Sequence, residues 1–298
     1  MMTINLCWWN LGISPPISKQ KQNKDKTISL AKSYILKFAE DHVIDFFAFC
    51  EISSDESHHL EEVARMLEME YLDLYGKDGR MIFDFAIMYE SSKLEHIPKY
   101  NKNLSITNPD GTKIRVGVRV SFKDLKTNKL VTFILSHWPS NLMDNREKRE
   151  YAAISVREII NKIFEQYTSN AQIICMGDYN DHPYSKPIHD RLFSTKDFHQ
   201  VRKKPKLLFN PFWSLLSDGG TNNIGTYHYK NTSGSDRWFV FDQMIFSSSF
   251  ICDEEDLLKL NFGKSSTYRI FNSDNTVADS IFLENFDHSP IFCEVYHG

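Results

Sequence analysis

The sequence has few of the features that would place it in a specialised class of protein. Its five cysteines are scattered along 298 residues, form no Cys-x-x-Cys pair, and lie in or beside apolar segments. An odd number of cysteines spread in this way argues against a disulfide framework and is typical of buried thiols in a reducing compartment. We therefore expect a cytoplasmic protein without structural disulfide bonds.

Long hydrophobic runs and a strong charge bias are also missing. No segment approaches the roughly 18 consecutive apolar residues of a membrane-spanning helix, and the first residues lack the basic region of a signal peptide. The formal net charge is −4, so the chain as a whole does not attract nucleic acid or an anionic membrane. We expect no stable membrane association, and any polyanionic substrate must meet a local basic patch or bound cations. The oligomeric state stays open.

What the sequence does contain is a large apolar and aromatic fraction. Hydrophobic residues make up 41% of the chain and aromatic residues 13%, which predicts a large core of bulky side chains. Segments with strand character alternate with helical patterns over residues 27–42 and 146–167. No internal repeat or linker divides the chain. We expect one α/β domain with mixed sheets over residues 1–298.

Residues 172–183 hold the most informative stretch. The apolar run 173–176 predicts a buried strand that Gly177 ends, and Asp178 and Asn180 follow directly. In α/β sheets, ligands bind beyond the carboxyl ends of the strands. There a carboxylate can hold or deprotonate a water and a carboxamide can donate to an oxyanion. Gly-Asp-x-Asn also suits a simple turn, and this stretch alone leaves both interpretations open.

Polar residues recur at the ends of other predicted strands. Each has an ordinary explanation as a turn, cap or satisfied core residue, but their joint occurrence indicates a shared site. Asp242 lies inside an apolar strand, where a carboxylate is costly unless it is paired or bound to a metal. The other members of the set are Asn10, Glu51, His137, Asp287 and His288.

These residues resemble the motifs of the endonuclease/exonuclease/phosphatase superfamily. That superfamily includes deoxyribonuclease-like and abasic-site nucleases, sphingomyelinases and inositol-polyphosphate phosphatases. The resemblance covers essentially the whole chain and implies an α/β (α+β) four-layer sandwich, in which two mixed β-sheets pack face to face with helices outside. It also implies a divalent cation, usually Mg²⁺, with Mn²⁺ as an alternative. The matching motifs are Trp9-Asn10, Phe49-Cys-Glu51, Ser136-His137-Trp-Pro-Ser, Gly177-Asp-Tyr-Asn180 and Asp287-His-x-Pro290.

The resemblance and the residue types together suggest a role for each side chain. Glu51 and Asp287, helped by Asn10, are expected to bind the cation, because Mg²⁺ prefers oxygen ligands. Asp178 is expected to orient or deprotonate the attacking water, and Asn180 to donate to the phosphoryl oxygens.

The two histidines are expected to act on the phosphate. His288 would contact a phosphate oxygen while Asp242 holds its imidazole in one tautomer. His137 would act as a general acid or bind phosphate on the leaving side.

Two positions depart from the family pattern. Phe286 stands where the family often has Ser, and Gln243 follows Asp242 where the family often has an aromatic residue or His. Both concern the hydrogen bonds that orient Asp287 and Asp242. Together, the motifs His137-Trp-Pro-Ser, Gly225-Thr-Tyr and Asp242-Gln resemble those of a bacterial branch of nuclease-like proteins.

The sequence therefore favours a metal-dependent phosphodiesterase, with a nuclease acting on DNA, or RNA, as the first hypothesis. Basic residues in 19–26, 146–149 and 202–206 are candidates for backbone phosphate contacts. Candidates for base stacking are Trp138, Trp213, Tyr227 and Tyr229. The alternatives are a phosphatase or phospholipase C-type hydrolase of inositol phosphates or phospholipids, and a binding module without catalytic activity.

Overall fold

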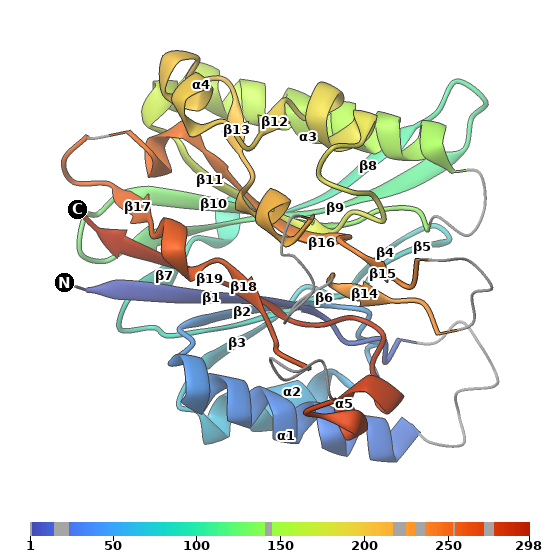
Figure 1. The fold of residues 1–298 in the computed structure, drawn as a ribbon. Coiled ribbons are helices and arrows are strands. Elements are labelled where there is room, and N and C mark those ends of the chain that lie inside the picture. Colours follow the sequence, from blue (N-terminus) through green and yellow to red (C-terminus); the bar gives the residue numbers. More distant parts are fainter. Residues whose placement is uncertain are drawn as a thin grey trace.

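The computed structural model describes residues 2–14, 24–140, 145–216, 225–230, 236–252, 254–270 and 277–298. These residues form four layers: two β-sheets lie face to face, and helices cover both outer faces (Figure 1). The predicted α/β four-layer sandwich is confirmed. Because one chain runs through both sheets, strand ends that are far apart in sequence meet at a common edge.

The first sheet has β1 (Thr3–Asn10) and β2 (Phe46–Cys50) at its centre, in parallel. Antiparallel neighbours extend it on both sides. Helices α1 (Lys24–His42), α2 (Ser57–Met66) and α5 (Ser280–Asn285) lie on its outer side. The remaining strands of this sheet are β3 (Glu70–Asp73), β6 (Phe85–Tyr89), β17 (Leu258–Leu260), β18 (Ser266–Thr267) and β19 (Ile291–His297).

The second sheet has a parallel pair at its centre, β10 (Leu130–His137) and β11 (Gln172–Asp178). Helices α3 (Arg146–Tyr167) and α4 (Phe198–Lys203) lie on its outer side. The other strands are β7 (Leu94–His96), β8 (Lys102–Thr107), β9 (Lys113–Asp124), β12 (Ser194–Thr195), β13 (Leu208–Phe209) and β16 (Asp242–Ser247).

Short elements connect the layers. Two small pairs stand apart from the main sheets: β4 (Gly76–Asp78) with β5 (Met81–Phe83), and β14 (Tyr227–His228) with β15 (Trp238–Phe239). A short π-helical turn spans η4 (Pro187–Arg191). The 3-10 segments are η2 (Pro98–Tyr100), η3 (Thr168–Asn170), η5 (Pro211–Leu216), η6 (Ser248–Phe250) and η7 (Phe262–Lys264).

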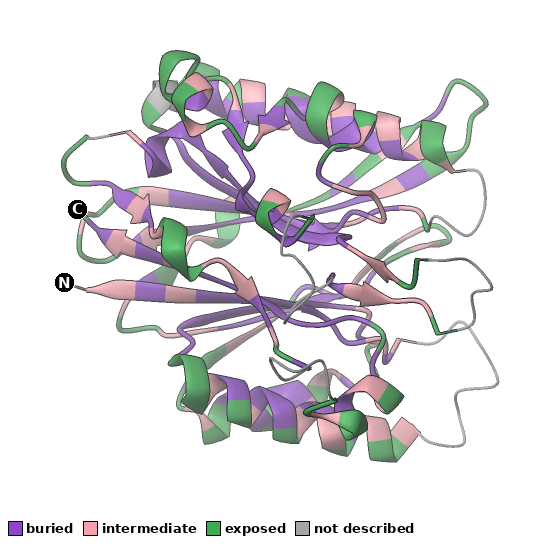
Figure 2. Cartoon of the chain, in the orientation of Figure 1, coloured by how far each residue is buried: buried purple, intermediate pink, exposed green. Residues whose placement is uncertain are grey.

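Strand β1 shows how the apolar sequence fills two core layers at once. Side chains of a strand alternate between its two faces, so Leu6 and Trp8 pack between the sheets while Cys7 and Trp9 pack toward α1. Both faces are covered, and the strand is therefore apolar from Leu6 to Trp9. Figure 2 shows the buried strands between helices whose outward sides are exposed.

Most predicted elements are present, and the differences have local causes. The helix predicted over 146–167 is found with those bounds. The apolar segment 82–89, which has the pattern of one strand, is interrupted at Asp84, and the segment 237–246 around Asp242 is interrupted before that residue. As a result, Asp84 immediately precedes β6 and Asp242 begins β16. Both carboxylates therefore lie at the N-terminal end of a strand, on the edge of the fold where β2 and β11 end. Strands β3, β8 and β17 and helix α5 are short and were not predicted.

Gly177 does not end β11, as the sequence pattern suggested, because the strand continues to Asp178. The residue is glycine because the strands approach closely here. A Cβ atom at this position would lie 2.2 Å from the carbonyl oxygen of Ser136 on β10. The glycine thus permits the close pairing that sets Asp178 beside β10.

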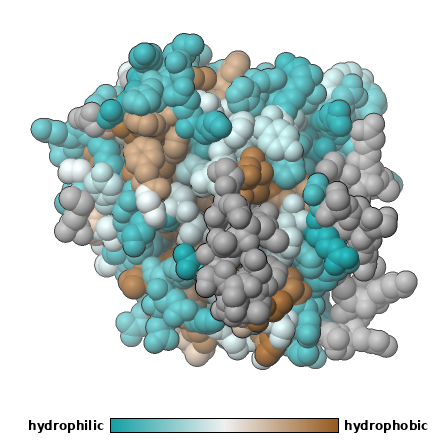
Figure 3. Space-filling view, in the orientation of Figure 1, coloured by the Kyte–Doolittle hydropathy of each residue, from teal (hydrophilic) through white to brown (hydrophobic). Residues whose placement is uncertain are grey.

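The face of the molecule seen in Figure 3 is mainly polar where its residues are described, and hydrophobic residues are scattered over it. Among the helices of the described residues, none combines the length and the apolar composition needed to cross a bilayer.

Candidate active site

Three strand ends of the second sheet place predicted site residues in one row. His137 at the end of β10 lies opposite Asp178 at the end of β11, and Asp178 lies opposite Asp242 at the start of β16. Side chains paired directly across neighbouring strands share a face of the sheet. The pairing register therefore brings together a histidine and two carboxylates from three distant parts of the chain.

The first sheet contributes Asn10 and Glu51 to the same place. Asn10 ends β1 and Glu51 follows β2, so the parallel pairing sets them side by side. The buried Asn10 amide donates through Nδ2 to Glu51 Oε1 at 2.9 Å and to Asp178 Oδ2 at 3.2 Å. Its Oδ1 accepts from the Gly12 N–H at 3.1 Å. Asn10 thus joins the two sheets and holds two carboxylates near each other.

Two of the site residues have left-handed backbone conformations. Glu51 has φ 58° and Asn180 has φ 51°, a region that costs about 1 kcal/mol or more for a residue with a Cβ atom. The Glu51 carbonyl accepts from the Ile13 and Ser14 N–H groups at 3.0 and 2.6 Å. The Asn180 N–H donates to Asp178 Oδ1 at 2.9 Å. These bonds hold conformations that aim the side chains at the strand edge.

His288 and Asp242 form a buried pair. His288 Nδ1 lies 2.8 Å from Asp242 Oδ2, and its Nε2 lies 3.7 Å from Asp178 Oδ2. Burial opposes protonation of the ring, but Asp242 and Asp178 outweigh it and hold the His288 pKa well above its usual value. His288 is therefore an imidazolium at neutral pH. The other Asp242 oxygen accepts from Trp8 Nε1 at 3.0 Å, which fixes the carboxylate.

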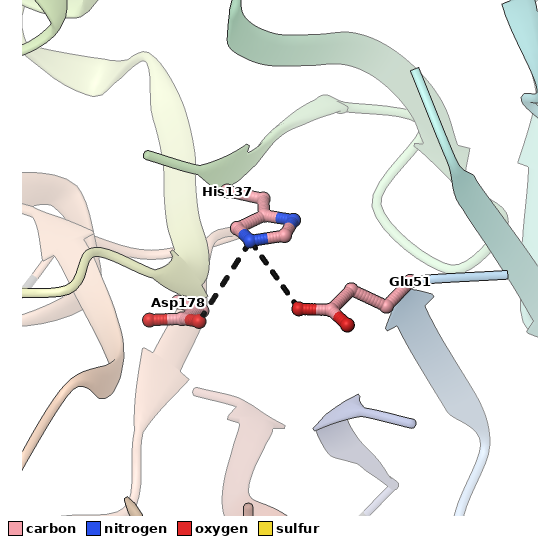
Figure 4. A group of neighbouring side chains, drawn as sticks. All are labelled: Glu51, His137 and Asp178. Carbon is pink, nitrogen blue, oxygen red and sulfur yellow. Dashed lines mark ion pairs between the residues drawn. The ribbon is translucent and has the colours of Figure 1, made fainter. Parts of the chain in front are cut away.

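His137 faces the carboxylates from the opposite side. In Figure 4 its Nε2 lies between Glu51 and Asp178, at 3.5 Å from Glu51 Oε1 and 4.0 Å from Asp178 Oδ2. Its Nδ1 lies 2.8 Å from Arg115 Nη2. Burial, and then Arg115 and His288, lower the His137 pKa well below its usual value. The ring is therefore neutral at pH 7.

The Glu51 and Asp178 carboxyl groups are harder to ionise than exposed ones. Burial raises the pKa of Glu51 to about 7, with Asp287 and Asp178 adding to the shift against Asn10 and His288. Burial likewise raises the pKa of Asp178 to about 6. Glu51, His137 and Asp178 lie close enough to share one ion, as do Asp178, Asp242 and His288. Carboxylate oxygens in this state fit a divalent cation, which would replace the protons.

The predicted ligands are not equally placed for an ion. Glu51 is in the cluster, whereas Asn10 turns its NH₂ group to the carboxylates and its oxygen to Gly12. Asp287 is exposed at the rim, near Gly12, and acts on Glu51 through its charge. Among the described residues, the groups close enough to share an ion do not include Asp287.

Several residues that shape the site were missed by sequence reasoning. Arg115 and Asp84 gave no motif, and Trp8 looked like an ordinary core aromatic. Arg115 Nη1 bonds to Asp84 Oδ1 at 2.7 Å. Thr226 Oγ1 accepts from the Asp242 N–H at 2.9 Å. One sequence signal could have found Asp84: it immediately precedes a buried strand, as Asp242 begins one.

The two departures from the family pattern have structural explanations. Phe286 packs against Trp9 with ring centroids 4.9 Å apart, and Trp9 Nε1 donates to the His288 carbonyl at 2.9 Å. Gln243 points away from His288: its side chain bonds to Asn210 and to the Asp181 carbonyl. The orientation of Asp242 comes instead from Trp8.

Some predicted substrate contacts are wrong. Trp138 is fully buried against Tyr179, and Arg149 is 3% exposed in an ion pair with Asp181. Arg202 and Lys203 lie in the last turn of α4, and residues 204–206 follow it. Arg202 bonds to the Ile251 carbonyl, which lies beyond the end of β16 that is far from Asp242. Of the basic run 19–26, residues 19–23 lie outside the described part of the chain.

Comparisons with known proteins bear on the family and the fold. A family model described as "Endonuclease/Exonuclease/phosphatase family" matches residues 17–285, and no curated protein matches.

Three solved structures illustrate the likeness in fold. One is an endonuclease/exonuclease/phosphatase family protein from Bacteroides thetaiotaomicron, with TM-score 0.62 and 16% identity over 100% of this chain and 96% of that chain. The human Nocturnin catalytic domain with bound sulfate has TM-score 0.60 and 11% identity over 99% of this chain and 95% of that one. D. rerio TDP2 complexed with single-strand DNA product has TM-score 0.60 and 13% identity over 99% of each chain. With the family match over residues 17–285, the chain belongs to the endonuclease/exonuclease/phosphatase family, whose enzymes are metal-dependent phosphoester hydrolases.

Proposed function

We propose that this phosphoester hydrolase is a Mg²⁺-dependent nuclease that cleaves the phosphodiester bonds of DNA, or RNA, by in-line attack of water. Mn²⁺ is expected to replace Mg²⁺. The observation that carries the proposal is that His288 Nε2 lies 3.7 Å from Asp178 Oδ2, in a cluster that also brings Glu51 and His137 to Asp178. An anionic phosphoryl group needs both a cationic donor and a base beside it.

The proposed metal ligand in the cluster is Glu51. Asn10 and Asp287, which the sequence also predicts as ligands, would complete the set once their oxygen atoms turn toward the ion, since Asn10 Oδ1 accepts from Gly12 and Asp287 lies outside the cluster. Their oxygen atoms suit Mg²⁺. When bound, the cation neutralises charge on a non-bridging oxygen and on the leaving group. Asn10 also keeps Glu51 in place through its 2.9 Å hydrogen bond.

Asp178 is proposed to orient and deprotonate the attacking water. Its pKa of about 6 is closer to neutrality than that of an exposed carboxylate, which suits a general base. Asn180 uses one Nδ2 hydrogen on the Trp138 carbonyl at 3.1 Å. The second hydrogen is left to donate to a phosphoryl oxygen.

The histidines are proposed to hold the phosphate from two sides. His288 donates through Nε2–H while Asp242 binds its Nδ1–H at 2.8 Å. His137 donates through Nε2–H as a neutral ring. Of the two roles expected for His137, phosphate binding fits this state better than general acid catalysis, because a neutral imidazole is a poor proton donor.

Nucleic acid as the substrate is supported by the D. rerio TDP2 structure, which was solved with a single-strand DNA product. That protein and this chain are 13% identical.

The test uses purified protein with Mg²⁺, and separately with Mn²⁺, on single- and double-stranded DNA, RNA, a phosphoinositide panel and sphingomyelin. EDTA and the variants Asp178→Asn and His288→Ala are the negative controls. We expect metal-dependent oligonucleotide cleavage that both variants lose. Release of phosphate or headgroup alone would assign a phosphatase or phospholipase C-type hydrolase instead, and inactivity on every substrate would favour a binding module.

A further inference from the structure

A series of aromatic rings leads from His288 to the surface. The Tyr227 ring centroid lies 4.7 Å from that of His288. Tyr227 stacks on Phe241 at 5.4 Å with an 18° angle between the rings, and Phe241 stacks on Phe239 at 5.2 Å and 25°. The β14–β15 pairing, which sets Tyr227 opposite Phe239, holds this part of the series together.

The series continues into the loop after β11. The Phe239 ring centroid lies 5.7 Å from that of His182, and His182 stacks on Tyr184 at 5.1 Å and 8°. We call Tyr227, Phe239, His182 and Tyr184 the aromatic strip, with Phe241 buried behind it. Its members come from three separate segments of the chain, so their alignment is a product of the tertiary fold.

The strip is exposed to a degree that core packing does not require. Tyr184 is 58% exposed, and the other three members are partly exposed. By contrast, aromatic rings that serve only the core, such as that of Trp138, are fully buried. Burial raises the pKa of the Tyr227 hydroxyl, with Asp287, Asp178 and Glu51 adding to the shift, which places this end of the strip beside the carboxylate cluster.

We propose that the aromatic strip is a stacking subsite for an unpaired base next to the scissile phosphate, so that single-stranded nucleic acid is the preferred substrate. This inference rests on the proposed nuclease function. A phosphate held by His288 brings its flanking nucleoside over Tyr227, because the Tyr227 ring adjoins that of His288, and Phe239 lies next along the strip. Every base has a π-face, so the subsite tolerates any sequence. A base in a duplex must first leave its stack, which disfavours double-stranded substrates.

Two variants test the strip, and a third serves as the matched control. Tyr184→Ala removes an exposed ring, and Phe239→Leu keeps apolar volume while removing the aromatic face. Phe262→Ala is the control, because Phe262 is 51% exposed and contacts Phe198 and Phe209, outside the strip. Circular dichroism and thermal melting establish that each variant is folded.

Binding is measured with oligonucleotides that carry a single 2-aminopurine at successive positions, using Asp178→Asn protein to prevent turnover. Stacking on a ring quenches 2-aminopurine, so we expect strong quenching at one or two adjacent positions of the single strand. The Tyr184→Ala and Phe239→Leu changes should relieve it and weaken single-strand binding by about tenfold, since base–aromatic stacking contributes about 1–3 kcal/mol per base. Phe262→Ala should bind as the parent does.

The outcomes separate the two proposals. Quenching that persists in both strip variants, or equal affinity for single and double strands in all proteins, overturns the stacking subsite even when the wild-type enzyme cleaves DNA. Position-specific quenching that both variants lose supports the subsite. Were the wild-type protein to show that quenching yet cleave no nucleic acid, the nuclease assignment would fail while the base-binding strip stood.

Discussion

Arg115 Nη2 lies 2.8 Å from His137 Nδ1. A guanidinium can only donate hydrogen bonds, so Nδ1 accepts and the ring proton sits on Nε2, the nitrogen that faces Glu51 and Asp178. Asp84 holds the guanidinium from behind at 2.7 Å. One ion pair outside the cluster thus sets the tautomer of a histidine inside it, and it leaves His137 as a hydrogen-bond donor, not a metal ligand.

Replacing Arg115 should change the tautomer and the pKa of His137. In Arg115→Met the His137 pKa rises toward its usual value, because the nearby cation that lowers it is gone. We expect kcat to fall by about 10- to 100-fold, in the range of a lost positioned donor, and the ¹⁵N NMR signals of His137 to change tautomer. Arg115→Lys keeps a charge without the two-pronged geometry. Lys113→Ala, at an exposed ion pair on the same strand, is the control. Unchanged His137 signals in Arg115→Met would contradict this account.

The Trp8–Asp242–His288 chain predicts a graded loss of activity. Asp242→Asn removes the negative charge that keeps His288 protonated, so we expect kcat to fall by about 10²-fold or more. Trp8→Phe keeps the ring in the core but deletes the 3.0 Å hydrogen bond to Asp242 Oδ1, and should cost about tenfold or less. Steady-state kinetics on a single-stranded oligonucleotide measures both. An Asp242→Asn enzyme with wild-type turnover would remove the pair from the mechanism.

Glu51 should make the stability of the metal-free protein depend on pH. Its pKa is about 7 in the folded protein against a reference value of 4.5. Between those values the folded state retains a proton that the unfolded state has lost, so stability falls as pH rises from 4.5 through 7. Glu51→Gln lacks this titration. In EDTA, the wild type should therefore lose up to about 3 kcal/mol relative to Glu51→Gln across that window.

The same two proteins, wild type and Glu51→Gln, should also differ in how much Mg²⁺ stabilises them. Because the cation binds the ionised carboxylate, adding Mg²⁺ at pH 8 should raise the Tm of the wild type more than that of Glu51→Gln. Thermal melts from pH 4.5 to 8, with and without Mg²⁺, measure both effects. A difference between the two proteins that does not vary with pH would rule out a raised Glu51 pKa.

Gly177 predicts a purely structural cost. In Gly177→Ala the new Cβ atom would meet the Ser136 carbonyl oxygen at 2.2 Å, and backbone cannot move aside cheaply. We expect a loss of about 2–4 kcal/mol in the free energy of unfolding and a loss of activity, since β11 carries Asp178. Gly79→Ala, in open space with φ 60°, should cost only about 1 kcal/mol. Urea denaturation compares the two variants. Equal midpoints would show that β10 and β11 can move apart at little cost, and would contradict this account.

Much of this protein follows from local sequence. The helix at residues 146–167 was predicted with its observed bounds, because helical periodicity depends on side chains three and four positions apart. The apolar strands and the polar residues at their ends were also visible, so Glu51, His137, Asp178, Asn180 and His288 could be named as site residues. Short edge strands such as β8 could not, since their pattern is set by the neighbour they pair with.

The tertiary structure alone decided how those residues meet. Pairing register across β10, β11 and β16 aligned His137, Asp178 and Asp242, and no local pattern encodes a register between strands 40 or more residues apart. The same holds for Trp8 on Asp242, 234 positions away. A hydrogen bond across that distance in sequence exists only once both sheets have packed, because burial of their shared apolar faces, and not the bond itself, brings the two side chains together.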